Sequence, residues 1–160
     1  MKISAKGRYG LKAVVDIAHN ATADGARVSI KSIAERQGIS ENYLEQIIAP
    51  LKKARIVNSV RGAGGGYYLA MPADKLTAGQ VLRILEGPLA PVDCVVDGTN
   101  VCGDADCALC VMKPAWNLIF AKVNEMMDNI TIAELVEDFD RLIAKLTDKD
   151  DTNGATQNLP

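Results

Sequence analysis

The chain has 160 residues, enough for one compact domain or for a small domain with an oligomerisation element attached. Its formal charge of −2 is unevenly divided: residues 1–83 carry 13 basic and 6 acidic side chains, whereas residues 84–160 carry 5 and 14. No run of 18 apolar residues and no apolar signal-peptide core occur, so we expect no membrane span and a cytoplasmic protein with reduced thiols. The basic half is typical of a surface that meets a polyanion, although uneven solvated charge would give the same count.

The first third of the chain predicts three helices. Ser4 is a good N-cap for the first helix, which should end near Asn20. A second, short helix ends at Gly38, and Ser40 caps a third helix almost at once. Pro50 interrupts the third helix pattern, so we expect a kink or an early end there.

A change of period after the third helix predicts a β-hairpin. The runs "IVNSV" and "YYLAM" flank a glycine-rich connection, which is typical of two short strands with a flexible tip. Thr77 should cap the next helix, and Gly87 should close it.

The last third predicts two amphipathic helices. The first starts near Pro114 and carries apolar residues at spacings of three and four as far as Ile130. Thr131 and Glu134 form a capping box for the second. The polar tail over residues 147–160 is expected to be disordered.

Two short helices joined by a tight turn and followed by a hairpin predict a winged helix-turn-helix, a mainly α fold with a small β-hairpin wing. In that fold the helix after Ser40 enters the major groove of double-stranded DNA. A single arginine at a glycine-rich wing tip suits a narrow minor groove. The candidate DNA-binding residues are Ser40, Tyr43, Glu45 and Gln46 on the helix, Arg61 on the wing, and Lys2, Arg8, Lys52 and Lys53 for phosphates.

The four cysteines of the chain lie within residues 94–110, with seven, four and two residues between successive thiols. Turn-forming residues separate them, so one short loop can bring all four sulfurs to one metal centre. The last two form Cys-x-x-Cys, a spacing common to zinc and iron-sulfur sites. A structural zinc, a thiol–disulfide switch and an iron-sulfur cluster are all chemically possible with the ligand set Cys94, Cys102, Cys107 and Cys110.

Five ordered stretches of the chain resemble one family of bacterial regulators. They are "MKISAKGRYGLKAV", "SIAERQGISENYLEQI", "SVRGAGGGYYLA", "EGPLAPV" and "NITIAELV". They are similar to the Rrf-type winged-helix regulators, the family of IscR, CymR and NsrR, and the resemblance runs from Met1 to about Leu146. It implies a homodimeric transcriptional repressor or activator, with Arg61 as the wing arginine and Tyr43, Glu45 and Gln46 on the recognition helix.

The same resemblance favours an iron-sulfur cluster, 2Fe-2S or 4Fe-4S, over zinc, because several members bind a cluster through cysteines in one loop. Those relatives usually have three cysteines. One alignment makes Cys110 the additional thiol and another makes Cys107 the additional thiol. Both leave four thiolates, so we expect all-cysteine ligation. Arg8 stands where nitric-oxide-sensing relatives carry an aspartate ligand, which argues against an aspartate-ligated cluster in this chain. His19 is not expected to be a ligand.

These observations predict a division of the chain into four parts. Residues 1–87 form the DNA-binding domain, 88–113 the cysteine loop, 114–146 the dimerisation helices and 147–160 the tail. A partner helix related by a two-fold axis would cover the apolar stripe of the first dimerisation helix and would match a pseudo-palindromic operator. Alternatively, the stripe packs within the chain against the first and last helices. The predicted interface residues are Trp116, Ile119, Phe120, Val123 and Met127.

Enzyme activity is not expected. The sequence shows no paired acid and base, no nucleophile with a neighbouring histidine and no phosphate-binding loop, since "GAGGG" falls in a hairpin. The remaining alternative is a winged-helix regulator with a structural zinc or a thiol switch, controlled by a metabolite or a protein partner.

Overall fold

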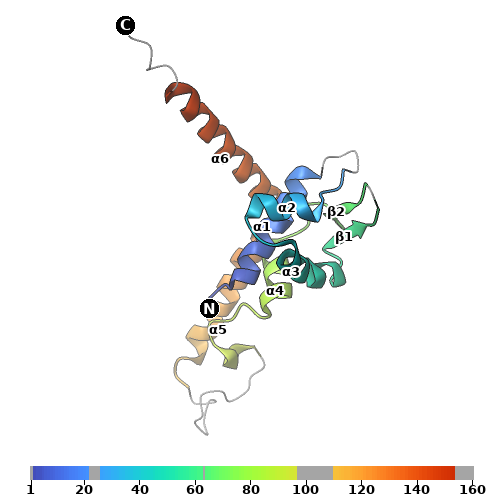
Figure 1. Cartoon of the computed structure of the whole chain (residues 1–160). Coiled ribbons are helices and arrows are strands. Elements are labelled where there is room, and N and C mark those ends of the chain that lie inside the picture. The colour runs from blue at the N-terminus through green and yellow to red at the C-terminus, as the bar shows by residue number, and fades with distance from the viewer. Residues whose placement is uncertain (1, 22–25, 63, 97–109, 154–160) are drawn as a thin grey trace.

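The computed structural model describes residues 2–21, 26–62, 64–96 and 110–153, and the side chains as far as Thr147. Helices dominate, and a two-stranded hairpin projects from one side (Figure 1). This architecture confirms the predicted fold class. The elements are α1 (Ala5–Asn20), α2 (Ile30–Gln37), α3 (Glu41–Lys53), β1 (Val57–Val60), β2 (Gly66–Leu69), α4 (Ala78–Glu86), the short 3-10 helix η1 (Asp93–Val95), α5 (Lys113–Asn129) and α6 (Ile132–Asn153).

The helix starts follow local capping chemistry. The hydroxyl oxygens of Ser4, Ser40 and Thr77 each accept a hydrogen bond from a backbone N–H three residues on, which confirms the three predicted caps. Gly38 ends α2 in the left-handed conformation with φ +65°, as predicted. Gln80 completes a capping box with Thr77, since its side-chain oxygen accepts from the N–H of Thr77 at 3.0 Å.

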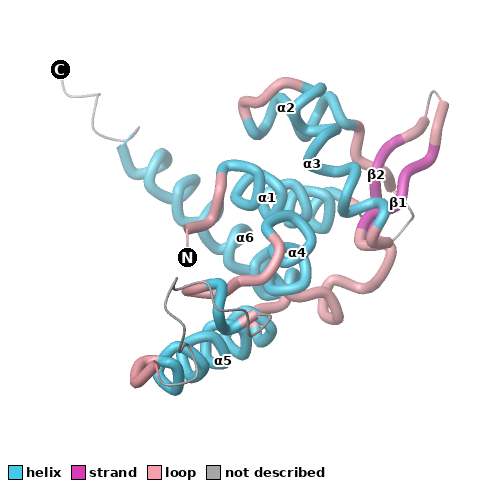
Figure 2. The backbone as a smooth tube through the Cα atoms, turned by 90° about the horizontal axis from the view of Figure 1, so that it is seen from below, coloured by secondary structure: helices cyan, strands magenta, loops and turns pink. Residues whose placement is uncertain are grey.

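The hydrophobic core lies where α1 to α4 and the base of the hairpin meet (Figure 2). Its largest side chains are fully buried, and α1 packs against α2, α3, α4, α6 and β2. Gly10 allows α4 to approach α1 closely, since a Cβ there would overlap the side chain of Leu85. The core therefore fixes the mutual positions of the predicted DNA-binding helices. Its largest members include Ile17, Ile33, Leu44, Ile47, Ile48, Leu51 and Leu76.

The hairpin is antiparallel, with Val57 opposite Leu69 and Val60 opposite Gly66. Val28, between α1 and α2, pairs with Tyr67 through two backbone hydrogen bonds of 2.9 and 2.8 Å. This bridge ties strand β2 of the wing to the segment that leads into α2.

Pro50 does not end α3, which continues to Lys53. The expectation of an early end is wrong because Pro50 lies in the last turn, where loss of one backbone N–H removes only the bond to the carbonyl of Gln46, an exposed residue. The helix ends at Lys53, and two residues further on Arg55 adopts φ +58°, with the N–H of Ile56 donating to the carbonyl of Leu51.

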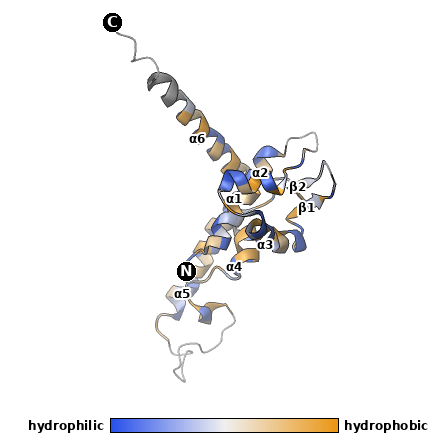
Figure 3. Ribbon diagram, viewed as in Figure 1, coloured by the Kyte–Doolittle hydropathy of each residue, from blue (hydrophilic) through white to orange (hydrophobic). Residues whose placement is uncertain are grey.

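The last two helices extend from the core in different directions (Figure 1). The start of α6 packs on α1 and buries Ile132, whereas its later part projects away from the body. The hydrophobic residues continue along this projecting part (Figure 3), where Leu142 and Leu146 are 60% and 65% exposed. The helix continues to Asn153, within the stretch of residues 147–160 for which the sequence predicts a disordered tail.

Candidate DNA interface and cysteine site

The first half of the candidate interface is the N-terminal end of α3. Ser40 is exposed, and its hydroxyl caps the helix by accepting from the N–H of Tyr43 at 3.2 Å. Glu45 and Gln46 are also exposed, whereas the Tyr43 ring is partly covered by an edge-on contact with Tyr9, 6.2 Å between centroids. Three of the four residues that we predict to contact DNA at α3 are thus exposed in the N-terminal part of the helix. The fourth, Tyr43, also joins α3 to α1.

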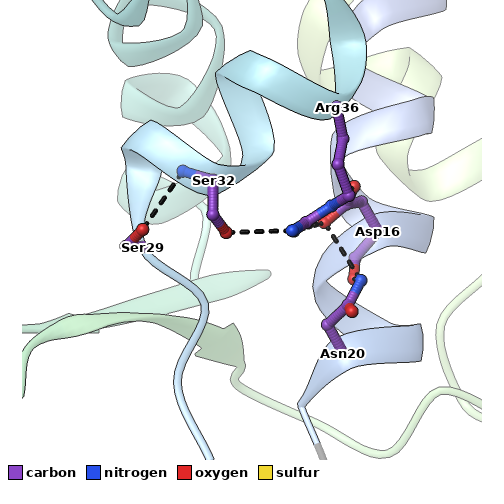
Figure 4. A network of polar contacts seen from close by, with 5 residues as sticks. All are labelled: Asp16, Asn20, Ser29, Ser32 and Arg36. Carbon is purple, nitrogen blue, oxygen red and sulfur yellow. Dashed lines mark hydrogen bonds and ion pairs between the residues drawn. The ribbon is translucent and has the colours of Figure 1, made fainter.

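A network of polar contacts holds α2, the first helix of the helix-turn-helix, on α1 (Figure 4). Arg36 donates from Nε to Oδ2 of Asp16 at 2.8 Å and from Nη2 to Oδ1 at 2.5 Å. A third donation goes from Nη1 to the Ser32 hydroxyl at 3.0 Å, and Asn20 donates to the backbone carbonyl of Asp16. The bond to Asp16 raises the pKa of Arg36 above its ordinary value, so the guanidinium is charged at any physiological pH.

The wing attaches to the end of α3. Lys52 donates from Nζ to the Ser59 hydroxyl on β1 at 2.5 Å, so one of the predicted phosphate ligands also bridges helix and wing. Lys53 and Arg61 are exposed, and Gly62 beside Arg61 has φ +111°, a conformation that favours glycine. Arg61 therefore lies at the start of the wing tip, and the residue after it adopts a backbone conformation that favours glycine.

The charge of Glu45 on α3 also acts on Tyr67 in wing strand β2. Burial raises the pKa of Tyr67, and the Glu45 carboxylate adds to that effect. The carboxylate of Glu45, a predicted DNA-binding residue, thus interacts electrostatically with Tyr67 on wing strand β2. Lys2 and Arg8 are exposed near the start of α1, on a different element from the recognition helix.

Two of the four cysteines fall within the described residues. Cys94 is buried in η1, 6% exposed, and η1 packs on α5. Cys110 is half-buried just before α5, and its carbonyl accepts from the N–H of Lys113 at 3.1 Å. Both have free thiols. Cys102 and Cys107 lie outside the described residues, and among the residues that are described no group of three or more potential metal ligands occurs.

The structure places α5 against α4 and η1 and leaves none of its side chains fully buried. Among the predicted interface residues, Ile119 is 42% exposed, and Trp116, Phe120, Val123 and Met127 are half-buried. The alternative in which α1 and α6 cover this stripe is not the packing observed, since α5 has α4 and η1 as its main neighbours.

His19 contributes to the packing of α6 on α1. Its ring meets that of Phe139 edge-on at 5.3 Å, and its Nε2 lies 3.1 Å from Oδ1 of Asp140 without hydrogen-bond geometry. These contacts place His19 at the junction of α1 and α6. No helix in the described ranges is long and apolar enough to cross a membrane.

Two helices joined by a tight turn, a core that fixes them on α1, and a wing tied to the second helix define the winged helix-turn-helix class of DNA-binding proteins. A family profile described as an iron-dependent transcriptional regulator, Rrf2, matches residues 3–138. The chain belongs to the Rrf2 family of transcriptional regulators. Because this family and the relatives below are regulators rather than enzymes, the expectation that the chain is not an enzyme is confirmed.

The chain is similar to two kinds of regulator within the family. CymR of Bacillus subtilis is 40% identical over 84% of this chain and 89% of its own length, and its solved structure covers 86% of this chain and 97% of CymR with a TM-score of 0.70. IscR of Vibrio atlanticus is 36% identical over 99% of this chain and 87% of its own length. The solved structure of T. potens IscR is 41% identical, covers 86% of this chain and 88% of that one, and gives a TM-score of 0.67.

Proposed function

We propose that the protein is a homodimeric transcriptional regulator whose affinity for a pseudo-palindromic operator depends on an iron-sulfur cluster held by Cys94, Cys102, Cys107 and Cys110. The observation that carries the proposal is the position of the two described cysteines. Cys94 is buried on η1 against α5, and Cys110 directly precedes the same helix. Ligation through both thiols would therefore link η1 to the start of α5.

The donor set fits such a group. Four thiolates are the usual ligands of 2Fe-2S and 4Fe-4S clusters, and the two described thiols are free to serve. A bound cluster would supply a redox- and iron-responsive centre beside α5. The family description as an iron-dependent regulator and the similarity to IscR support this assignment over zinc.

The homodimer is supported by the surfaces of the last two helices. No side chain of α5 is fully buried, and α6 exposes Leu142 and Leu146 along its projecting part. Exposed apolar surface of this extent is expected to be covered by another chain. A two-fold dimer presents two recognition helices to two half-sites of a palindrome, which is the geometry that a pseudo-palindromic operator requires.

A second candidate is a regulator controlled by a metabolite or a protein partner, with a structural zinc or a thiol pair in place of the cluster. The similarity to CymR, described as the global cysteine regulator of B. subtilis, favours this alternative. Zinc needs the same four thiolates, whereas a thiol switch needs only two of them.

Anaerobic purification followed by a visible spectrum and by iron, sulfide and zinc analysis separates the candidates. The cluster proposal predicts a coloured protein with iron and sulfide in equal amounts, which Cys94→Ser and Cys110→Ser diminish. Ala108→Ser is the matched control, since it adds the same hydroxyl between the last two cysteines without removing a thiol. A colourless protein with one zinc per chain would contradict the cluster proposal and favour the second candidate.

A further inference from the structure

The junction of α4 and α5 contains an arginine that joins two helices far apart in the sequence. Arg83 of α4 donates from Nη1 to Oδ1 of Asn124 at 2.9 Å and from Nη2 to Oδ1 of Asp128. The two acceptors lie one turn apart on α5. Asn124 is itself oriented, because its Nδ2 donates to the carbonyl of Phe120 at 2.8 Å. These two hydrogen bonds, which we call the Arg83 fork, thus hold this turn of α5 at one rotation about its helix axis.

The same turn of α5 is also in close backbone contact with α4. A Cβ at Gly79, one turn before Arg83, would overlap Oδ1 of Asp128 and lie 3.1 Å from the backbone carbon of Met127. The glycine therefore brings the helices close enough for the Arg83 fork to reach both acceptors.

The C-terminal end of α5 has a second, independent attachment. The N–H of Ala78 donates to the carbonyl of Ile130, and the N–H of Ile132 donates to the carbonyl of Leu76, each at 2.8 Å. These bonds fix the end of α5. The hydrogen bonds of Arg83 add a further point of attachment, at Asn124 and Asp128, within about two turns of that end.

We propose that Arg83 is a positioning residue that sets the orientation of α5 on the winged domain and, through it, the distance between the two recognition helices of the dimer. The inference rests on the proposed function in one respect, that α5 pairs with its copy across a two-fold axis. Because α4 packs on both α1 and α3, an altered tilt of α5 changes the relation of one recognition helix to the other while each winged domain stays intact.

The test compares duplexes that differ only in half-site spacing. A palindromic duplex is selected from a random-sequence library with the wild-type protein, and a second duplex carries one additional base pair between its half-sites. We expect the wild type to prefer the selected spacing by roughly 10-fold or more, and Arg83→Ala to reduce the preference below about 3-fold. Binding to a duplex with a single half-site should remain within about 2-fold of the wild type.

Gly79→Ala provides an independent variant, since it displaces α5 sterically, keeps every polar group and substitutes a better helix former. It should lower the spacing preference in the same way. Arg141→Ala is the control, because the pair of Arg141 with Asp138 lies within α6 and joins no two elements. It should leave the preference unchanged.

Two results would overturn the inference, and they are distinguishable from each other. If the wild type prefers one spacing and both Arg83→Ala and Gly79→Ala retain that preference, Arg83 does not position the helix. If Arg83→Ala weakens binding to full and single half-sites equally, its role is only to stabilise the fold. A wild type that sediments as a monomer, or that shows no spacing preference, would contradict the proposed dimeric regulator itself.

Discussion

Arg36 and Asp16 form a two-point ion pair between α2 and α1, with Nε to Oδ2 at 2.8 Å and Nη2 to Oδ1 at 2.5 Å. Asp16 is 11% exposed at its side chain and Arg36 is 41% exposed, so one member is shielded and the other is open to solvent. The pair holds the first helix of the helix-turn-helix on α1, and this helix packs on α3, the predicted recognition helix.

Arg36→Ala is expected to lower the free energy of unfolding by about 1 kcal/mol, a value limited by solvent screening of the arginine. It should also weaken operator binding, since α2 loses its polar attachment to α1. Arg141→Ala, which removes an exposed pair within one helix, should change stability by less than about 0.5 kcal/mol. Urea unfolding of the three proteins measures the difference, and equal midpoints would show that the Arg36–Asp16 pair does not stabilise the fold.

Arg61→Ala is expected to weaken binding to the selected operator more than binding to unrelated DNA, because a wing arginine reads groove shape. Lys53→Ala should weaken both alike and lower the slope of log affinity against log salt by about one unit. Fluorescence anisotropy at several salt concentrations measures both. An unchanged operator affinity for Arg61→Ala would show that the wing does not enter the groove.

Ile119→Asp is expected to shift the protein from dimer to monomer, because a partner helix would have to bury the new carboxylate. Lys122→Ala, one turn further along the same helix at an exposed polar position, should remain dimeric. Sedimentation equilibrium distinguishes the 17.1 kDa chain from its dimer. If Ile119→Asp sediments as the wild type does, the dimer uses a different surface.

The capping box at the start of α6 predicts a pH dependence. Hydrogen bonds from the backbone N–H of Thr131, at 2.8 Å, and from its hydroxyl lower the pKa of Glu134. Because the folded pKa lies below the unfolded one, the carboxylate stabilises the fold above the unfolded value of about 4.3, and this contribution is lost as the pH falls through the folded value.

Glu134→Gln removes the titrating group and keeps an acceptor. The stability difference between wild type and Glu134→Gln should be constant near neutral pH and should shrink as the pH falls below about 4. Urea midpoints measured from pH 7 to pH 3 follow it. A difference that stays constant over this range would show that the Glu134 carboxylate does not act through its charge.

The sequence predicts those parts of the fold that depend on local chemistry. The caps at Ser4, Ser40 and Thr77 and the left-handed Gly38 each need only a few neighbouring residues, and all four are confirmed. Pro50 lies inside α3, which continues to Lys53, so this proline does not mark the end of the helix, and the sequence alone does not reveal that the helix accommodates it.

Contacts between distant residues carry no comparable signal. Arg36 and Asp16 are 20 positions apart, and Arg83 and Asp128 are 45 apart, so nothing in either local sequence indicates its partner. The pairing of Val28 with Tyr67 is likewise a product of the folded chain. The cysteine ligand set stays a prediction, since Cys102 and Cys107 lie outside the described residues.

We propose that a cluster on the four thiolates controls operator binding. The most direct test measures the affinity of the selected operator for cluster-loaded and metal-free protein, anaerobically and at fixed salt. The claim predicts affinities that differ by roughly 5-fold or more, the range of ordinary coupling between two sites. Equal affinities of the loaded and metal-free forms would contradict it.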